Sequence, residues 1–452
     1  LVTSFPSASN PRSVVALTDS KSQQDAAIRA YLVGMRRKEF SMPDAEEHLE
    51  ELKELVATMG VPVMGSEMVN LMMPSPKYLI GSGKAEMIKQ AALANEANLI
   101  IIDDELSPAQ QNNWDKLFGE AVIDRREVIL DIFKQRARSR EAVLQVELAR
   151  LEYSLPRLKR LWTHLERQRG GAGFVGGAGE AQIEVDRRII RNSIAQCKRE
   201  LVAVRSQRAT QRKARQGKPV PVAAIVGYTN SGKSTLLNTL THSDVLAENK
   251  LFATLDPTTR RMVLPNNQEL LLTDTVGFIR KLPHMLVDAF KATLEESQQA
   301  DFLIHVLDAS HPAVLDHLAA TEAVLEELDV SGKQTVYVLN KMDLVTDEVT
   351  FAELRQRLQP SVLTSMVTGQ GLDELKGILA DFTGKNLIPI TVRVPPSRAD
   401  ITSFLYREGH ILNQRFDGDE NVLEVALDEK FHSRVADFID KDPVMKAIPR
   451  TL

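Results

Sequence analysis

The sequence has little cysteine, few aromatic residues and no long apolar run. Cys197 is the single cysteine among 452 residues, which excludes an internal disulfide and fits a reducing compartment. We interpret Cys197 as a small apolar residue on a helix rather than as a reactive thiol. The apolar run Leu99–Ile102 is far too short to cross a bilayer, which takes roughly 18–20 residues, and no other run comes near that length. The sequence therefore predicts no stable membrane insertion.

Length and charge indicate that the chain has several domains and one strongly basic segment. A chain of 452 residues exceeds what one hydrophobic core supports, so several domains are expected. The net charge of −5 conceals an uneven distribution, because residues 134–215 hold 20 Lys and Arg but 8 Asp and Glu. That segment carries about +12 and the remainder about −17. A basic block in an acidic protein indicates contact with a polyanion, or else a solvated helix face.

Local patterns divide the chain into segments of different character. Residues 1–24 are rich in serine and lack periodicity, which is typical of a disordered segment. Further along the chain, Ser107 followed by Pro108 has the pattern of a helix start. We expect, in order, a disordered lead at 1–24, a small N-terminal α/β domain at 25–132, a basic antiparallel helical hairpin at 133–216, an α/β domain with a mainly parallel sheet at 217–385, and a small C-terminal α+β domain at 386–452. The C-terminal segment is expected to form a strand at 388–394, a helix at 402–413, a strand at 421–427 and a helix at 430–440.

Two heptad seams predict the hairpin. The first seam is Leu144, Leu148, Leu151, Leu155, Leu158, Trp162 and Leu165, and the second is Ile183, Ile190, Ile194, Cys197, Leu201 and Val204. Residues 170–179 between them are so rich in glycine that we expect no helix there, and Pro156 should kink the first helix. We interpret the glycine segment as a functional tip rather than a simple turn, because a turn needs far fewer residues. Arginines flank this tip at positions 167, 169, 187 and 188.

A phosphate-binding loop follows the hairpin. The apolar strand Val222–Val226 leads into Gly-Tyr-Thr-Asn-Ser-Gly-Lys-Ser at 227–234, and a helix begins at Thr235. This is the P-loop pattern in the context of strand, loop and helix that it requires. Its glycines let backbone N–H groups surround phosphate oxygens, and the helix N-terminus adds its positive dipole end. Lys233 is then expected to contact the outer phosphates, and the Ser234 hydroxyl to bind Mg²⁺.

Three further motifs follow in order. A strand at 269–272 leads into Asp-Thr-Val-Gly at 274–277, where Asp274 can hold Mg²⁺ through water and the Gly277 N–H can bind the γ-phosphate. Asn-Lys-Met-Asp at 340–343 places Asp343 to accept two N–H bonds from guanine, which adenine cannot offer. Thr-Ser-Met at 364–366 can cover the guanine carbonyl with backbone N–H groups, although many guanine-nucleotide proteins have alanine where Met366 stands. Together the motifs resemble the Ras-like translation-factor class of P-loop GTPases.

The segment 251–261 lies between the first two motifs, where GTPases carry a switch threonine that binds Mg²⁺. Thr254, Thr258 and Thr259 compete for this role. We choose Thr254 because the segment resembles the Phe-x-Thr-Leu switch of Obg-like and HflX GTPases. Phe278 stands where Ras-type enzymes have the glutamine that orients water, so slow intrinsic hydrolysis is expected. Asn230 matches an asparagine that binds K⁺ in related GTPases; either K⁺ assists hydrolysis, or Asn230 only shapes the loop.

Several blocks outside these motifs resemble the HflX family of ribosome-associated GTPases, over about residues 45–385. They are residues 77–84, 122–125, 129–133, 135–139, 144–149, 162–168, 186–188, 275–280 and 291–294. The resemblance implies a GTP hydrolase that binds the large (50S) ribosomal subunit, is stimulated by it, and acts in ribosome splitting, rescue or subunit biogenesis. It also implies that the hairpin tip contacts ribosomal RNA. The family usually reads Gly-Pro-Gly-Glu-Thr-Gln at the tip, whereas this chain has Gly-Ala-Gly-Glu-Ala-Gln at 177–182, so a looser tip is expected.

The site predictions follow from the motifs and the resemblance together. The predicted nucleotide-binding residues are Gly227, Tyr228, Thr229, Asn230, Ser231, Gly232, Lys233, Ser234, Phe252, Ala253, Thr254, Leu255, Asp256, Asp274, Thr275, Val276, Gly277, Asn340, Lys341, Met342, Asp343, Thr364, Ser365 and Met366. The predicted catalytic residues are Lys233, Thr254 and Gly277, and the predicted Mg²⁺ ligands are Ser234, Thr254 and, through water, Asp274. The predicted RNA-binding residues are Arg167, Arg169, Arg187 and Arg188.

Two other functions stay open at this point. One is an RNA-remodelling ATPase centred on residues 25–215, with Gly-Ser-Gly-Lys at 81–84 as its phosphate-loop candidate. The other is a nucleotide-gated regulator of a protein partner. For the leading interpretation we expect GTP and GDP as ligands, Mg²⁺ as cofactor with K⁺ as a further candidate, and a monomer. We expect a cytoplasmic location, with a peripheral position at the membrane as the alternative.

Overall fold

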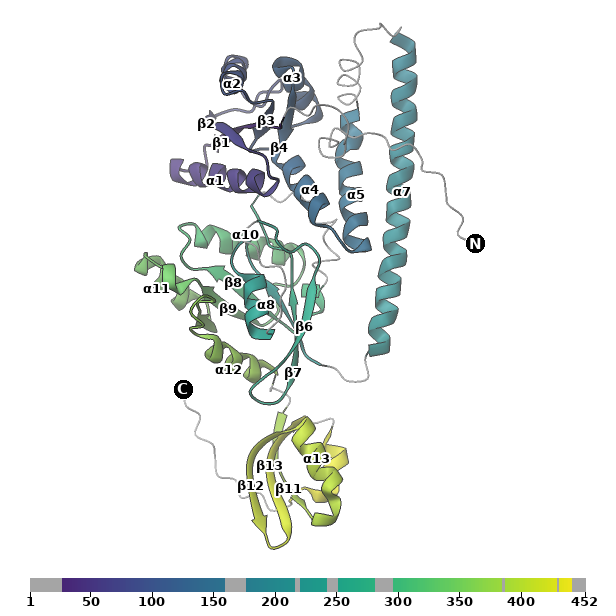
Figure 1. Ribbon diagram of the computed structural model, residues 1–452, viewed down its shortest axis with the longest axis vertical. Helices are drawn as coiled ribbons and strands as arrows, with labels where there is room; N and C mark the ends of the chain where they lie inside the picture. The colour runs from purple at the N-terminus through teal and green to yellow at the C-terminus, as the bar shows by residue number, and fades with distance from the viewer. Residues whose placement is uncertain are drawn as a thin grey trace.

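The computed structural model describes residues 27–158, 176–215, 220–241, 251–280, 296–383, 387–428 and 431–440. These residues form three separate sheets, which follow one another along the long axis of the molecule with a long helical hairpin beside the first two (Figure 1). The predicted multidomain α/β class, with a helical hairpin and a C-terminal α+β region, is confirmed. None of the helices within the described ranges is long and apolar enough to cross a membrane.

The N-terminal sheet has four parallel strands in the order β2-β1-β3-β4. They are β1 Ala30–Arg37, β2 Val63–Leu71, β3 Leu99–Ile102 and β4 Ala121–Asp124, and the helices are α1 Met42–Thr58, α2 Ser82–Ala94, α3 Pro108–Phe118 and α4 Arg125–Arg136. The expected helix start is present, because the Ser107 hydroxyl accepts the Gln110 N–H at 3.2 Å and Pro108 occupies the first turn. Asp124 caps α4, which runs across the expected domain boundary between 132 and 133. The domain limits therefore stay a prediction.

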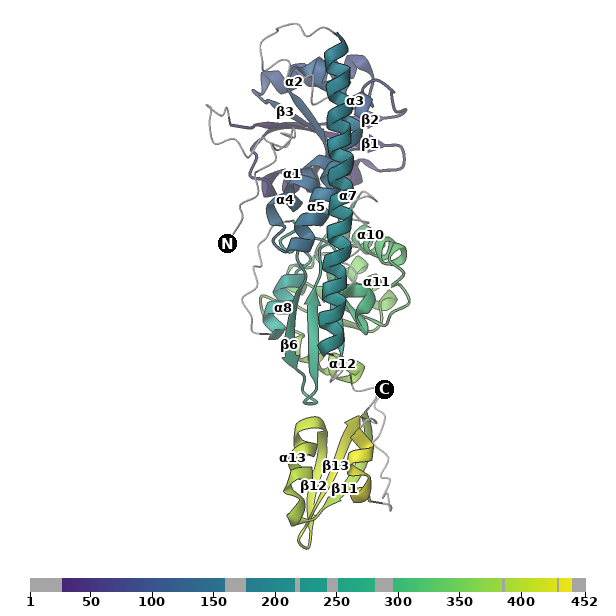
Figure 2. The same cartoon turned by 90° about the vertical axis from the view of Figure 1, so that its right-hand side faces the viewer.

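The hairpin pairs α5 (Arg140–Ser154) with α7 (Gly176–Arg215), which passes beside both the N-terminal and the central sheet (Figures 1 and 2). Its antiparallel direction follows from the ion pairs, since Glu141 lies 3.7 Å from Arg205 while Glu152 lies 2.9 Å from Lys198. The predicted second seam faces inward, with Cys197 buried. α5 ends at Ser154, and Pro156 lies in the 3₁₀ turn that follows, η1 Leu155–Arg157. Proline has no N–H to donate, so it does not continue the hydrogen bonding of the α-helix.

One expectation about the hairpin is wrong. Residues 176–179 were expected to lie outside a helix, but they form the first turn of α7. Each glycine costs a helix about 1 kcal/mol relative to alanine, which weakens a helix without forbidding it, and the turn continues a helix of 40 residues. Residues 159–175, which include Arg167 and Arg169, lie outside the described residues.

The central sheet has six strands in the order β10-β9-β8-β5-β7-β6, and only β6 runs antiparallel to its neighbour. The strands are β5 Val222–Val226, β6 Thr258–Val263, β7 Glu269–Asp274, β8 Phe302–Asp308, β9 Thr335–Asn340 and β10 Ser361–Leu363. The helices are α8 Lys233–Thr241, α10 Val314–Glu327, α11 Glu348–Arg357 and α12 Leu372–Thr383, with a short 3₁₀ turn η2 at Met342–Leu344. Strands β5, β8 and β9 are almost entirely buried, so the predicted motifs that follow them meet at one edge of the sheet.

The C-terminal sheet is antiparallel, with its three strands in the order β11-β13-β12. Its elements are β11 Leu387–Val394, α13 Ala399–Glu408, β12 His410–Asp417, β13 Glu420–Asp428 and the short helix α14 His432–Val435. The expected helix at 402–413 is wrong beyond Glu408, because Gly409 is extended and β12 begins at His410. Gly418, with φ +62°, then makes the turn that pairs β12 with β13.

Candidate nucleotide site

The P-loop joins β5 to α8 and depends on two glycines. Gly227 has φ +145° and Gly232 has φ +102°, conformations that other residues rarely adopt. A Cβ on Gly227 would overlap the Val306 carbonyl oxygen, and one on Gly232 would overlap the Asn340 amide. The loop is therefore packed directly against β8 and the end of β9, which fixes the direction of its backbone N–H groups.

A pocket opens above this loop. Its lining comes from the P-loop, from the switch segment around Thr254, and from the residues after β7. The lining residues are Thr229, Asn230, Gly232, Lys233, Ser234, Thr235, Phe252, Ala253, Thr254, Thr275 and Gly277. Gly277 leaves no room for a side chain, since a Cβ there would lie 2.9 Å from Lys233 Nζ. The pocket thus brings together predicted residues that are up to 48 positions apart in the sequence.

Three oxygen-bearing side chains meet beside Lys233. The Ser234 hydroxyl donates to Asp274 Oδ2 at 2.6 Å and lies 2.8 Å from Thr254 Oγ1. Asp274 is fully buried, and its Oδ1 has no hydrogen-bond partner among the described atoms. Burial raises the pKa of Asp274, although Lys233 and Ser234 oppose the shift. Hydroxyl and carboxylate oxygens are the ligands that Mg²⁺ takes in phosphate sites, so this cluster fits a Mg²⁺ ion.

Lys233 is buried at the base of the pocket, and its ammonium donates to the Tyr228 carbonyl oxygen at 2.5 Å. Burial disfavours the charged form and lowers the pKa of Lys233 to about 8, against the opposing effect of Asp274. A phosphate ligand interacts with the charged ammonium, so the protonation of Lys233 and the binding of phosphate are linked.

This linkage predicts a pH dependence of nucleotide affinity. Below pH 8 the free protein already carries the charged lysine, so GTP affinity should be constant. Above pH 8 the free lysine loses its proton first, so affinity should fall by up to about tenfold per pH unit. Titrations with a fluorescent GTP analogue between pH 7 and 9 measure this, with thermal unfolding as the control for folding. Affinity that stays constant through pH 9 would contradict the assigned pKa.

The two predicted guanine-binding segments are joined at the other side of the P-loop. The Asn340 amide donates to the Ser231 carbonyl oxygen at 2.9 Å, and the Met342 N–H donates to the Thr364 carbonyl oxygen at 3.2 Å. Asp343 lies in η2 and is exposed, whereas Thr364 and Ser365 are buried. Lys341 has φ +62° and pairs with Asp308 at 2.6 Å. The Asp343 carboxylate is therefore accessible to a base that binds beside the P-loop.

Phe278 occupies the position after Gly277 and is buried. Its backbone pairs with the P-loop, since the Thr229 N–H donates to the Phe278 carbonyl oxygen at 2.8 Å and the Phe278 N–H donates to Gly227 at 3.1 Å. The side chain has no group that orients water. The expectation that hydrolysis needs a group from elsewhere stays a prediction.

Not every predicted residue faces the pocket. Asp256 binds the segment just before α5 instead, where it accepts the Arg138 N–H at 2.9 Å, the Ser139 N–H at 3.0 Å and the hydroxyl of Ser139, the N-cap residue of α5. Its neighbour Leu255 is buried in the core. Phe252 lines the pocket and also packs edge-on against Phe133 of α4, with ring centroids 4.6 Å apart. The switch segment is therefore held by the hairpin and by α4.

The sequence did not reveal the role of the Tyr228 side chain. Its hydroxyl bonds to the Glu51 carboxylate of α1 and accepts the Arg280 N–H at 2.8 Å. Glu51 in turn pairs with the buried Arg125, which also contacts Asp103 at 2.8 Å. A residue of the P-loop is thus tied to the N-terminal sheet. The polar residue types were visible in the sequence, but no local pattern joins them.

The alternative phosphate loop lacks the features of the P-loop. Gly81 precedes α2, and a Cβ on Gly81 or Gly83 would meet nothing within 4 Å. Lys84 pairs with Glu67 at 3.4 Å rather than facing a cradle of N–H groups. At the hairpin, Arg187 pairs with Glu184 and Arg188 is exposed.

The strand–loop–helix cradle, the Ser–Thr–Asp cluster and the Asn-Lys-Met-Asp loop together define a P-loop GTPase, an enzyme that hydrolyses GTP. Family models match residues 46–134 as "GTP-binding GTPase N-terminal", 136–215 as "GTP-binding GTPase Middle Region" and 222–341 as "50S ribosome-binding GTPase". The chain belongs to the GTPase HflX family.

Relatives from several bacteria support this assignment. The chain is 45% identical to GTPase HflX of Akkermansia muciniphila, over 91% of this chain and 97% of the relative. It is 42% identical to GTPase HflX of Escherichia coli, over 89% of this chain and 94% of the relative.

A solved GTP-binding protein from Sulfolobus solfataricus, in complex with GDP, is 28% identical and covers 79% of this chain and 98% of its own, with a TM-score of 0.43.

Proposed function

We propose that the chain hydrolyses GTP on the large ribosomal subunit, which it contacts through the basic hairpin. The main support for this contact is α7, because this helix of 40 residues belongs to the segment with a net charge of about +12. Its first residues lie at the end of the molecule farthest from the C-terminal sheet (Figure 1). A projecting basic helix suits a polyanion such as ribosomal RNA. Relatives named GTPase HflX and the model described as 50S ribosome-binding support this partner.

The pocket supplies the nucleotide chemistry of this proposal. Ser234, Thr254 and Asp274 would hold Mg²⁺, which neutralises phosphate charge. Lys233 and the P-loop N–H groups would orient the triphosphate, and Asp343 would select guanine. Phe278 orients no water, so the ribosomal subunit would complete the catalytic site. Splitting, rescue or subunit biogenesis in the cytoplasm follows from this partner, and K⁺ at Asn230 stays a prediction.

Stimulation by the ribosome tests the proposal. We expect GTP turnover to rise when 50S subunits are added, and co-sedimentation with them to weaken steeply with salt. Arg188→Ala should lower both, because Arg188 is exposed near the start of α7. Arg199→Ala is the matched control, since Arg199 is exposed on the same helix but farther from the tip. The proposal would be refuted if 50S subunits neither stimulated GTP turnover by the wild type nor co-sedimented with it.

Guanine selection has its own test. Asp343→Asn replaces two acceptor oxygens by one acceptor and one donor, so it should weaken GTP and strengthen xanthosine triphosphate. An N–H group of the bound base that is left without an acceptor costs about 1–3 kcal/mol, which corresponds to a roughly 5- to 150-fold change in preference. Competition binding with both nucleotides measures the change. A variant that keeps its original preference for GTP would show that Asp343 does not read the base.

A further inference from the structure

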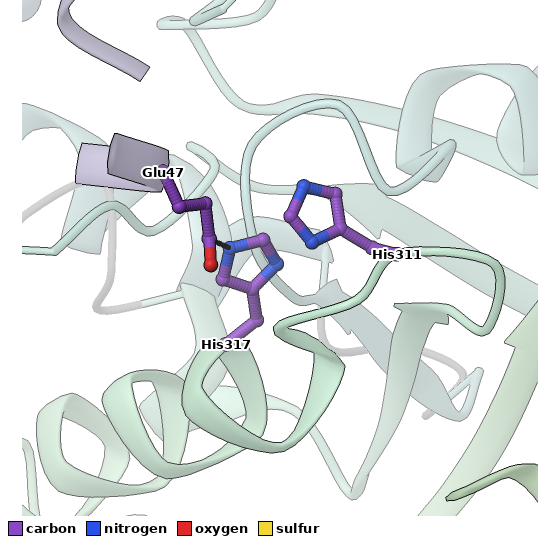
Figure 3. Close-up of side chains that lie close together, drawn as sticks. All are labelled: Glu47, His311 and His317. Atoms are coloured by element: carbon purple, nitrogen blue, oxygen red, sulfur yellow. Dashed lines mark ion pairs between the residues drawn. The ribbon is translucent and has the colours of Figure 1, made fainter. Parts of the chain in front are cut away.

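Glu47, His311 and His317 form a cluster outside the nucleotide pocket (Figure 3). Glu47 comes from α1 beside the N-terminal sheet, His311 from the loop after β8, and His317 from α10 beside the central sheet. One ligand atom from each residue lies within 4.8 Å of the others, and Glu47 Oε1 is 3.6 Å from His317 Nε2. We propose that these three side chains bind a divalent transition metal ion, with Zn²⁺ as the best match, between the two sheets.

The donor set decides the class of ion. Two imidazoles and one carboxylate are the ligands of open zinc sites, where water takes the fourth position. Imidazole suits Zn²⁺, Cu²⁺ and Ni²⁺, whereas Mg²⁺ requires oxygen ligands, so the ion differs from that of the nucleotide pocket. Glu47 and His311 are half-buried and His317 is buried, which leaves a path for an ion to enter.

The spacing is close to what a bound ion needs. Bonds of about 2.0–2.1 Å in a tetrahedron place ligand atoms roughly 3.4 Å apart. Glu47 and His317 already satisfy this separation within a few tenths of an ångström. His311 has to approach further, and it lies in a loop rather than in α10. His317 is held in place, because its ring stacks on Tyr228 with centroids 3.7 Å apart and planes at 6°.

Burial and neighbouring charges shift the pKa values of two side chains in the cluster. Burial opposes the Glu47 carboxylate, but His317 and Arg280 outweigh it and lower the pKa of Glu47 to about 2. Burial, together with the neighbouring His317, lowers the pKa of His311, against Glu47 and Asp308.

Arg280 is the competitor for this site. Its Nη2 lies 2.5 Å from Glu47 Oε1, so a metal ion would have to displace the guanidinium from this oxygen. Arg280 has a second carboxylate within reach, because its Nη1 is 3.8 Å from Asp316 Oδ2. Removing Arg280 should therefore tighten metal binding, which distinguishes a metal site from an ion-pair cluster.

The experiment uses tag-free full-length protein, stripped with a chelator and titrated with Co²⁺ and Zn²⁺. We expect one high-affinity ion per chain, a visible Co²⁺ spectrum with nitrogen ligands, and displacement of Co²⁺ by Zn²⁺ but not by excess Mg²⁺. Zn²⁺ should also raise the unfolding temperature, since it joins α1 to α10. His311→Ala and His317→Phe should each weaken binding at least about tenfold, and Arg280→Met should strengthen it. Phenylalanine keeps the ring over Tyr228 while removing its nitrogens.

His432→Ala is the matched control, because His432 lies in the C-terminal helix α14, away from the cluster. It should bind Co²⁺ as tightly as the wild type. Binding by the wild type no tighter than by the His311→Ala/His317→Phe double variant would overturn the proposal. An equal loss in His432→Ala would overturn it as well, because the ion would then sit on scattered surface histidines. GTP binding is measured separately, so failure of the metal site leaves the proposed function untouched.

Discussion

Lys233→Ala should lower GTP turnover by about 100- to 1,000-fold, the usual loss when one preorganised group that stabilises developing charge is removed. Lys233 is buried at the base of the pocket, 2.5 Å from the Tyr228 carbonyl oxygen, and within the described pocket lining it is the single cationic side chain. Without it, the phosphates lose their direct charge partner from the protein. Single-turnover hydrolysis with bound nucleotide separates this loss from weaker binding.

The matched control is Lys84→Ala, which removes the lysine of the other Gly-Ser-Gly-Lys sequence. Lys84 is tied to Glu67 at 3.4 Å and faces no cradle, so GTP turnover should not change. A Lys233→Ala variant that keeps turnover within a few-fold of the wild type would contradict the assignment. An equal loss in Lys84→Ala would contradict it as well, because turnover would then not depend specifically on the P-loop lysine.

Arg125→Met should cost about 3–5 kcal/mol of unfolding free energy, the loss typical of a buried ion pair from which one partner is removed. Arg125 is 3% exposed and lies between Glu51 and Asp103. Burial opposes its charge, but both carboxylates outweigh this and raise the pKa of Arg125. Methionine fills the space but removes the guanidinium from both carboxylates. Denaturant unfolding in a Trp162→Phe background, followed by the fluorescence of the buried Trp114, reports on this sheet.

Two further variants make this prediction sharp. Arg29→Met should change stability by less than about 0.5 kcal/mol, because Arg29 forms an exposed pair with Glu96 at 4.0 Å. Adding Glu51→Gln and Asp103→Asn to Arg125→Met should restore part of the lost stability, since neutral amides then stand where two buried carboxylates had lost their guanidinium. Equal effects of Arg125→Met and Arg29→Met would show that the buried network contributes little.

The parts of the site that local sequence could predict are those fixed by short motifs. A strand followed by a glycine loop and a helix allows few backbone arrangements, so residues 227–234 were recognisable as a P-loop. The carboxyl ends of parallel strands meet at one edge, so the motifs after β5, β7 and β9 converge there. The structure places Thr254, and neither Thr258 nor Thr259, next to Ser234, because the latter two belong to β6. Its role as a Mg²⁺ ligand stays a prediction.

The parts that could not be predicted depend on contacts between distant segments. Tyr228 and Glu51 are 177 positions apart, and Asp256 and Ser139 are 117 apart. Nothing in either neighbourhood indicates its partner, since tyrosine in a P-loop and aspartate in a switch segment fit the pocket equally well. The strand β12 was missed for a related reason. Residues 410–413 were expected to end a helix, and pairing with β13 makes them part of a strand.

Retention of labelled GTP by the purified full-length protein in Mg²⁺ buffer is the measurement that tests the central claim most directly. The geometry of the P-loop, Lys233 and Asp343 predicts one GTP per chain, displaced by unlabelled GTP or GDP but not by the same excess of ATP. Failure to retain GTP, or equal displacement by ATP, would contradict the assignment of this pocket as a guanine-nucleotide site.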